Sequence, residues 1–235
     1  MDDVVATEQR SPKQTPLQQF FKNLADFGES LFRTFVLSAM LLPVLLASFL
    51  TVDLPLRAFD HFFAAAILRP SVWLSWGGAI MSLAPLLAIL YARRWGGDEA
   101  SRVVTASWGV AALLVFAEIS YLAPQLSAED FPTTRFVAAF VISAMAAQYF
   151  AAAFYDVTRG GGAWWRAPLY AAMAAYAVGA FLYYPIAYWG SGAPWPNWII
   201  GDLMVKLVFA FAFLPIYHMF KRTLRPRGGY GGDWR

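Results

Sequence analysis

Long apolar runs separated by short polar segments dominate the hydrophobic pattern of the chain. A membrane-spanning helix needs about 20 predominantly apolar residues. Runs that meet this requirement cover residues 31–52, 72–91, 103–122, 136–155, 169–189 and 198–220. The pattern therefore predicts an all-α membrane protein, a six-transmembrane-helix bundle.

Polar segments divide the chain into three parts. Residues 1–30 are polar and mixed in charge, and we interpret them as an N-terminal tail that ends in a short amphipathic stretch. Residues 31–220 form the predicted six-helix transmembrane domain, and residues 221–235 form a polar, glycine-rich C-terminal tail. Within the domain, residues 54–68 are apolar but too short and too polar to span, which favours an interfacial or re-entrant helix on the outer face.

Basic residues are concentrated on one side of the predicted bundle. With six spans, both tails and two loops fall together and carry Arg10, Lys13, Lys22, Arg33, Arg93, Arg94, Arg102, Arg159, Arg166 and Lys221. The opposite loops carry Arg57, Arg69 and Arg135. Positive charge favours the cytoplasmic side. We therefore expect a multi-pass protein of a bacterial inner membrane with both termini in the cytoplasm; seven spans would place one basic terminus outside.

Composition excludes several functional classes. The chain is 59% hydrophobic and 14% charged, whereas soluble domains carry about 25% charge. It has no cysteine, which excludes disulfides, zinc–thiolate sites and cysteine nucleophiles. Its basic residues cluster at helix ends rather than along one face, so nucleic acid is not an expected partner. His61 and His218 fall on opposite sides, and no catalytic set is apparent, so we expect neither metal, cofactor nor enzymatic activity.

Four polar positions stand out inside the predicted spans. They are Glu118, Gln148, Asp202 and Lys206. An ionisable residue costs about 2.5–3.5 kcal/mol at the centre of a span, so each needs a function or a partner. Asp202 and Lys206 are four residues apart and therefore share a helical face.

Lys206 lies about eight residues below the outer end of its span, or about 12 Å at the helical rise. From that depth it cannot reach either surface, so it must be paired or face a wet cavity. One interpretation is a structural ion pair that links the third and sixth spans. The other is a solute pocket lined by Lys206, Asp202 and Glu118. Tyr176, Tyr183 and Gln148 would then add hydroxyl and amide groups suited to a flat, polar heterocycle.

Small and aromatic residues predict the packing of the bundle. Alanines are dense in the fourth and fifth spans, which indicates that these two helices approach closely inside the bundle. Tryptophans gather near the span boundaries at Trp73, Trp76, Trp95, Trp164, Trp165, Trp189, Trp195 and Trp198. Such positions are typical of an interfacial aromatic belt.

Three segments resemble the VUT family of vitamin-uptake or queuosine-precursor transporters. The first runs from Gly77-Gly78 to Pro85 and continues through Arg93-Arg94-Trp95-Gly96. The second contains Tyr155-Asp156, Trp164-Trp165-Arg166 and Ile186-Ala187-Tyr188-Trp189-Gly190. The third contains Gly201-Asp202, Lys206 and Pro215-Ile216-Tyr217. The resemblance implies a bundle similar to the substrate-binding components of energy-coupling-factor transporters, and uptake of a queuosine precursor of the 7-deazapurine type.

The chain departs from the pattern of that family at two places. An acidic pair near the end of the second span is replaced by Ile89 and Arg93, and a Ser…Gln…Asp element in the fifth span by Ala171, Tyr176 and Gly179. The acids that would hold a guanine-like edge are therefore absent from those positions. Lys206 matches the family pattern.

The sequence favours a transporter for a small polar solute in the lipid bilayer. Two other hypotheses stay open. The chain could be a non-transporting accessory or structural subunit of a larger membrane complex, or a substrate-capturing component driven by a separate ATPase. A homo-oligomer is compatible with each of them.

Overall fold

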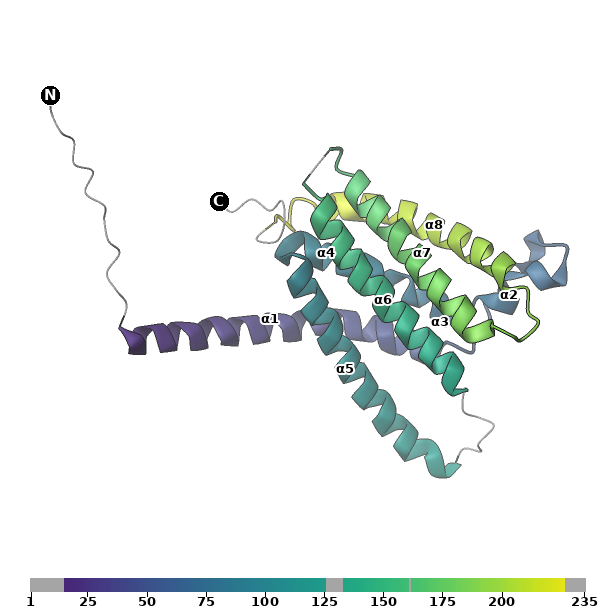
Figure 1. Cartoon of the computed structure of the whole chain (residues 1–235), viewed down its shortest axis with the longest axis horizontal. Helices are drawn as coiled ribbons and strands as arrows, with labels where there is room; N and C mark the ends of the chain where they lie inside the picture. Colours follow the sequence, from purple (N-terminus) through teal and green to yellow (C-terminus); the bar gives the residue numbers. More distant parts are fainter. Residues whose placement is uncertain (1–14, 126–132, 161, 227–235) are drawn as a thin grey trace.

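The computed structural model describes residues 15–125, 133–160 and 162–226. These residues form helices, single 3₁₀ turns and connecting segments (Figure 1). The elements are α1 (Pro16–Leu50), η1 (Asp60–Phe62), η2 (Ala66–Leu68), α2 (Pro70–Trp73), α3 (Trp76–Met81), α4 (Leu83–Trp95), α5 (Gly97–Leu122), η3 (Ala123–Gln125), α6 (Thr134–Thr158), α7 (Arg166–Tyr188) and α8 (Trp195–Phe220). Most of the predicted tails, residues 1–14 and 227–235, lies outside the described residues.

Six of these helical segments are long and apolar enough to cross a membrane, with α3 and α4 counted as one span. This confirms the predicted all-helical fold and its six spans. The ends of the bundle differ in character. We call the end that holds Trp73 and the start of α8 the Trp73 end, and the end that holds Arg93 and the C-terminus of α8 the Arg93 end.

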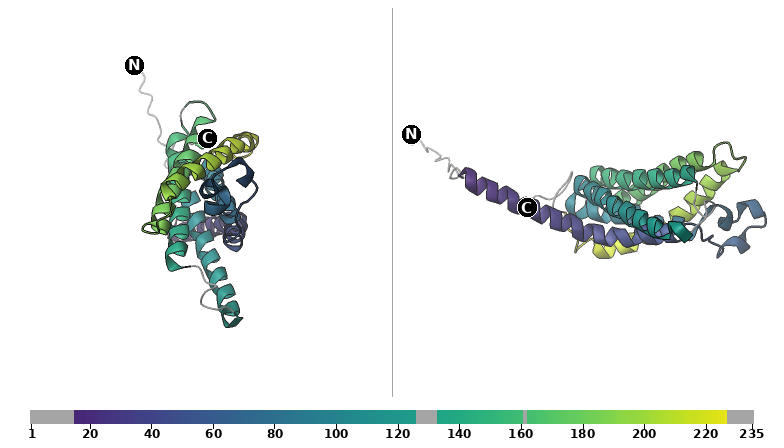
Figure 2. Two further views of the ribbon diagram at one scale, coloured as in Figure 1. Left: turned by 90° about the vertical axis from the view of Figure 1, so that its right-hand side faces the viewer. Right: turned by 90° about the horizontal axis from the view of Figure 1, so that it is seen from below.

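Helix α1 begins much earlier than the predicted first span. The Thr15 hydroxyl accepts the backbone N–H of Gln18, and the Gln18 side chain accepts the backbone N–H of Thr15. This capping box starts a helix that continues without a break for 35 residues, or roughly 52 Å. Because the hydrocarbon core is about 30 Å thick, the first half of α1 extends beyond the bundle at the Arg93 end (Figure 2).

Helices α6 and α7 lie side by side, and α4 packs behind them against α5 and α6 (Figure 1). Alanine side chains fill the α6–α7 interface, and Ala147, Ala151, Ala171 and Ala175 are all buried. The predicted close packing of these helices is therefore confirmed. The most buried span is the one made by α3 and α4. In its most apolar stretch, 61% of the residues are buried inside the protein.

Helix α1 crosses α3 at an unusually short distance. The Ser48 hydroxyl donates to the Gly77 carbonyl at 2.6 Å. A Cβ atom on Gly77 would lie 2.6 Å from the Cα of Val52, closer than nonbonded carbons approach. Glycine at position 77 therefore permits the crossing.

Residues 51–75, which we call the cap segment, cover the Trp73 end. An isolated β-bridge pairs Pro55 with Ser75, supported by Leu56 N–H donating to the Leu74 carbonyl at 3.0 Å. The predicted interfacial helix over residues 54–68 is wrong. Since the bridge holds the two ends of the segment together, the chain between them must turn back, and it forms the 3₁₀ turns η1 and η2 instead.

A carboxylate fastens the turn η1 to the start of α2. The Asp60 Oδ1 accepts the backbone N–H of Ser71 at 3.0 Å. Hydrogen bonds from Ser71, helped by the positive charges of Arg69 and Arg57, lower the pKa of Asp60 below its ordinary value. Asp60 is therefore ionised at neutral pH, and its carboxylate holds η1 against the start of α2.

Candidate functional site

A cavity of about 80 Å³ lies inside the bundle toward the Trp73 end. Its walls come from the cap segment, α3, α4, α6, α7 and α8. The residues are Val52, Trp73, Leu74, Ser75, Gly78, Met81, Ser82, Pro85, Phe140, Ser143, Ala144, Ala147, Ala175, Tyr176, Gly179, Tyr183, Tyr184, Asp202 and Lys206.

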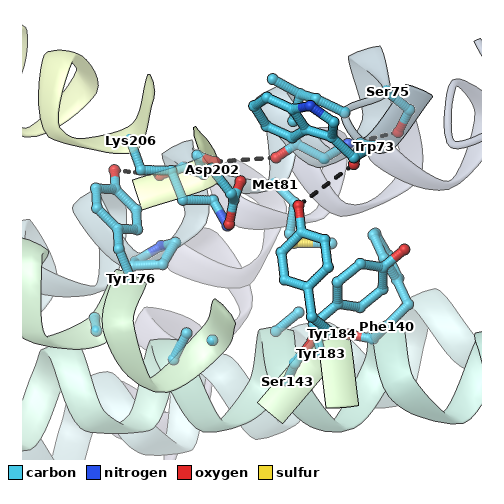
Figure 3. Close-up of a pocket in the computed structure, with 18 of the residues that line it drawn as sticks. Trp73, Ser75, Met81, Phe140, Ser143, Tyr176, Tyr183, Tyr184, Asp202 and Lys206 are labelled. Atoms are coloured by element: carbon cyan, nitrogen blue, oxygen red, sulfur yellow. Dashed lines mark hydrogen bonds and ion pairs between the residues drawn. The ribbon is translucent and has the colours of Figure 1, made fainter. Parts of the chain in front are cut away.

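An ion pair on α8 supplies the charge of this cavity. The Lys206 Nζ lies 2.6 Å from the Asp202 Oδ2, across one turn of the helix. Side-chain exposure is 3% for Asp202 and 18% for Lys206. Both side chains point into the same space as Tyr176, Tyr183 and Tyr184 (Figure 3). The predicted pairing of Asp202 with Lys206 is confirmed, and the pair faces a cavity rather than a solid core.

Tyrosine hydroxyls of α7 attach this helix to the opposite wall. The Tyr176 hydroxyl donates to the Ser82 carbonyl at 2.8 Å, and the Tyr184 hydroxyl donates to the Trp73 carbonyl at 3.4 Å. Ser82 marks the junction of α3 and α4. Pro85 follows it and cannot donate a backbone hydrogen bond, which favours an interruption of the helix there. The Ser82 hydroxyl donates to the Gly78 carbonyl at 3.0 Å and the Ser82 carbonyl accepts from Tyr176, so the polar groups of the junction are bonded within the protein at the depth of the cavity.

Trp73 forms part of the cavity wall. Its ring rests against Gly201 of α8, where a Cβ atom would lie 2.8 Å from the ring atom Cζ2. Its indole N–H donates to the Leu68 carbonyl at 3.2 Å, and Trp198 donates similarly to Ile67 at 3.1 Å. Both rings are buried. The cap segment folds over both rings, so they contact protein rather than surrounding lipid.

Gln148 lies one layer behind the cavity. It is fully buried and accepts the indole N–H of Trp108 at 3.2 Å. Its amide nitrogen lies 3.9 Å from the sulfur of Met81, which itself lines the cavity. Gln148 therefore supports the wall and does not form it.

Glu118 lies on the second half of α5, where the helix diverges from the bundle (Figures 1 and 2). Its side chain is exposed in the protein, and it is not among the residues that line the cavity. The structure therefore brings together Asp202, Lys206, Tyr176 and Tyr183, but not Glu118. The prediction relied on depth along the span, whereas α5 tilts its second half away from α8.

A more open pocket of about 150 Å³ adjoins the cavity at the Trp73 end. The two share five lining residues, Val52, Trp73, Leu74, Ser75 and Tyr183. Asp53 and Tyr188 line the outer pocket but not the cavity. The two pockets therefore share a wall, and we call the outer one the vestibule.

The Arg93 end is closed by a hydrogen-bonded cluster that the sequence did not predict. Arg93 donates to the hydroxyls of Tyr217 and Tyr155 at 2.7 and 3.3 Å, and to the Lys221 carbonyl at 3.0 Å. Arg159 donates to the Ala92 and Arg93 carbonyls at the end of α4. These bonds join α4, α6 and α8 beneath the cavity. The only indication of this cluster in the sequence was Arg93, which stands where the family pattern has an acidic residue.

Comparison with known proteins decides the family. Residues 75–220 match the family model described as "Putative vitamin uptake transporter". The chain belongs to this family. The resemblance of the three sequence segments to the VUT family is thereby confirmed. Searches of curated proteins and of solved structures found no match.

The part of this VUT protein that matches the family begins at the last residue of the cap segment. Most of the cavity wall falls inside the match, including the Asp202–Lys206 pair. Val52, Trp73 and Leu74 fall outside it. The cap segment thus contributes three cavity-lining residues from outside the matched range. Among the described residues, no group of three His, Asp or Glu side chains is placed to hold a metal ion.

Proposed function

We propose that this protein takes up a small, flat, polar solute through the cavity between α3–α4, α7 and α8. The observation that carries the proposal is the Asp202–Lys206 pair, which faces a cavity inside an otherwise apolar span. Intramembrane charges of this kind are costly and mark solute pathways. A 7-deazapurine such as a queuosine precursor is the cargo that the family resemblance implies.

The walls of the cavity suit a planar molecule. Aromatic rings of Trp73, Phe140, Tyr183 and Tyr184 line it, and small side chains of α6 and α7 leave room between them. Asp202 accepts hydrogen bonds and Lys206 donates them, and the Ser143 hydroxyl, which donates to the Phe140 carbonyl at 3.1 Å, can accept one. A heterocycle could therefore stack on the rings while its edge bonds to α8.

We propose that the Arg93 end faces the cytoplasm. Basic residues at or near this end are Arg33, Arg93, Arg94, Arg102, Arg159, Arg166, Lys221, Arg222 and Arg225. The Trp73 end carries Arg57, Arg69 and Arg135 among the described residues. Positive-inside asymmetry then places the vestibule on the outer side of the membrane. The solute would enter past Asp53 and Tyr188 and stop above the closed Arg93 cluster.

The α3–α4 junction supports a transport role. In many transporters the solute binds near the bilayer midplane, beside irregular positions of the spanning helices. Here the α3–α4 junction at Ser82 lies beside the ion pair of α8. The junction, held by Tyr176, is the element whose movement would connect the cavity with the Arg93 end.

A binding screen tests the proposal. The purified protein would be heated with purines, 7-deazapurines and vitamins, and its unfolding temperature followed by intrinsic fluorescence. We expect at least one flat, polar heterocycle to raise that temperature in the native protein and not in Lys206→Ala. If no compound is bound, or if the Lys206→Ala variant binds as the native protein does, the proposed site is wrong.

A further inference from the structure

We infer that the cavity selects solutes that carry no net charge and that present a hydrogen-bond donor beside an acceptor. This inference rests on the proposed function and adds the chemical class that the site would accept. It follows from the charge balance of the ion pair on α8 and not from any particular cargo.

The charge balance of the cavity is zero. Asp202 and Lys206 are the charged residues among those that line it, and they neutralise each other at 2.6 Å. The Asp202 side chain is almost fully buried. A charge removed from water is tolerated only when it is paired. A solute that captured one partner for itself would leave the other buried without a counter-charge.

A solute with a net negative charge and one with a net positive charge should therefore both bind weakly, because each would separate the ion pair. An anion would draw Lys206 away from Asp202 and leave the carboxylate unpaired in the deepest part of the wall. A cation would pair with Asp202 and leave the ammonium of Lys206 unpaired. A neutral solute can bond to both residues without separating them, so the pair keeps its own attraction.

The pair still has bonding capacity to offer. Asp202 uses Oδ2 toward Lys206, and a carboxylate accepts further bonds at its second oxygen. An ammonium has three donors, of which one is used by Asp202. The acceptor and the donor lie one helical turn apart on the same face. A cyclic or open amide, with N–H next to C=O, matches this order.

The Tyr176 hydroxyl adds a constraint of the same kind. Its proton is directed to the Ser82 carbonyl at 2.8 Å. The hydroxyl oxygen is then left as an acceptor toward the cavity. A second N–H group on the solute could donate a hydrogen bond to the Tyr176 oxygen. A second carboxylate oxygen would instead be repelled, because both oxygens are acceptors. The surroundings of the ion pair thus also disfavour anions.

Three flat molecules of nearly equal shape separate the charge classes. Benzamide is neutral and carries N–H beside C=O, benzoate is a net anion, and benzamidine is a net cation at neutral pH. Each would be titrated into the detergent-purified native protein at millimolar concentration, with the dissociation constant measured by calorimetry. We expect benzamide to bind at least about tenfold more tightly than either ion.

Two variants reverse the preference if the charge balance sets it. Lys206→Met leaves Asp202 unpaired and should favour benzamidine about tenfold over benzamide. Asp202→Asn leaves Lys206 unpaired and should favour benzoate by a similar factor. The double variant Asp202→Asn/Lys206→Met restores neutrality and should prefer benzamide again. The double variant also serves if a single variant does not fold.

The outcomes separate this inference from the proposed function. If benzamide, benzoate and benzamidine bind the native protein equally, or if an ion binds best, the charge selection is wrong while solute binding stands. If none of the three binds and the screen of heterocycles also gives no ligand, the proposed function is wrong and this inference fails with it. A benzamide preference that survives in both single variants would assign the selection to other groups.

Discussion

The guanidinium of Arg93 on α4 donates a 2.7 Å hydrogen bond to the hydroxyl of Tyr217 on α8. The same hydroxyl lies 2.7 Å from that of Tyr155 on α6, and the Tyr217 ring lies under the guanidinium at 5.1 Å. Three spans therefore meet at one buried cluster. Any movement that opens the cavity toward the Arg93 end must first separate Arg93 from Tyr217.

Replacing Arg93 should destabilise the bundle. Arg93→Gln removes charge-assisted hydrogen bonds that contribute about 1.5–3 kcal/mol each and leaves the buried tyrosine hydroxyls with fewer donors. We expect the unfolding free energy in detergent to fall by about 2–4 kcal/mol. The neighbouring Arg94→Gln is the control, since Arg94 donates to exposed carbonyls of residues 223 and 225. Equal losses for the two variants would contradict the role of the cluster.

The crossing of α1 over α3 should not tolerate a larger residue at position 77. In Gly77→Ala the new Cβ meets the backbone of Ser48 and Val52, and overpacking of this kind costs about 1–3 kcal/mol or more. Gly109→Ala is the matched control, because nothing lies within 4 Å of its Cβ position. Thermal unfolding should show a clear loss for Gly77→Ala and no loss for Gly109→Ala. Similar unfolding temperatures would show that the helices do not cross this closely.

The contact of Trp73 with Gly201 should couple the cap segment to solute binding. An alanine at position 201 would displace the Trp73 ring, whose Cζ2 lies 2.8 Å from the added Cβ. The ring lines both the cavity and the vestibule, so we expect Gly201→Ala to weaken binding of the screened ligand about tenfold or more. Calorimetric titration measures this, with Gly109→Ala again as control. Unchanged affinity would show that Trp73 does not contribute to solute binding.

The six spans were predictable because the length of an apolar span depends on the solvent and hardly on tertiary contacts. Runs of about 20 apolar residues have few alternatives in a bilayer. The cap segment was not predictable from its own residues. Its shape depends on the pairing of Pro55 with Ser75, a contact between positions that no local pattern joins.

The site was predictable where the relevant contact is local. Asp202 and Lys206 are four residues apart on one helix, so their pairing follows from helical geometry. The prediction for Glu118 required the tilt of α5 relative to α8, which packing determines. The burial of Trp73 was not predictable for the same reason, since its ring packs against Gly201, more than a hundred positions away along the chain.

The proposed orientation is open to a direct test, because the chain has no native cysteine. Single cysteines would be placed at Ser191, exposed at the Trp73 end, and at Thr223, exposed at the Arg93 end. In intact cells a membrane-impermeant maleimide should label Ser191→Cys and leave Thr223→Cys unlabelled until the membrane is opened. The opposite labelling would invert the protein and place the vestibule in the cytoplasm.

The central claim is that solute passes through the cavity at Lys206. Its most direct test is uptake of a radiolabelled ligand from the screen into proteoliposomes that hold the native protein, Lys206→Met or Glu118→Gln. We predict uptake by the native protein and by Glu118→Gln, and at least about a tenfold lower rate for correctly inserted Lys206→Met. Undiminished uptake by Lys206→Met, or its loss in Glu118→Gln alone, would contradict the account.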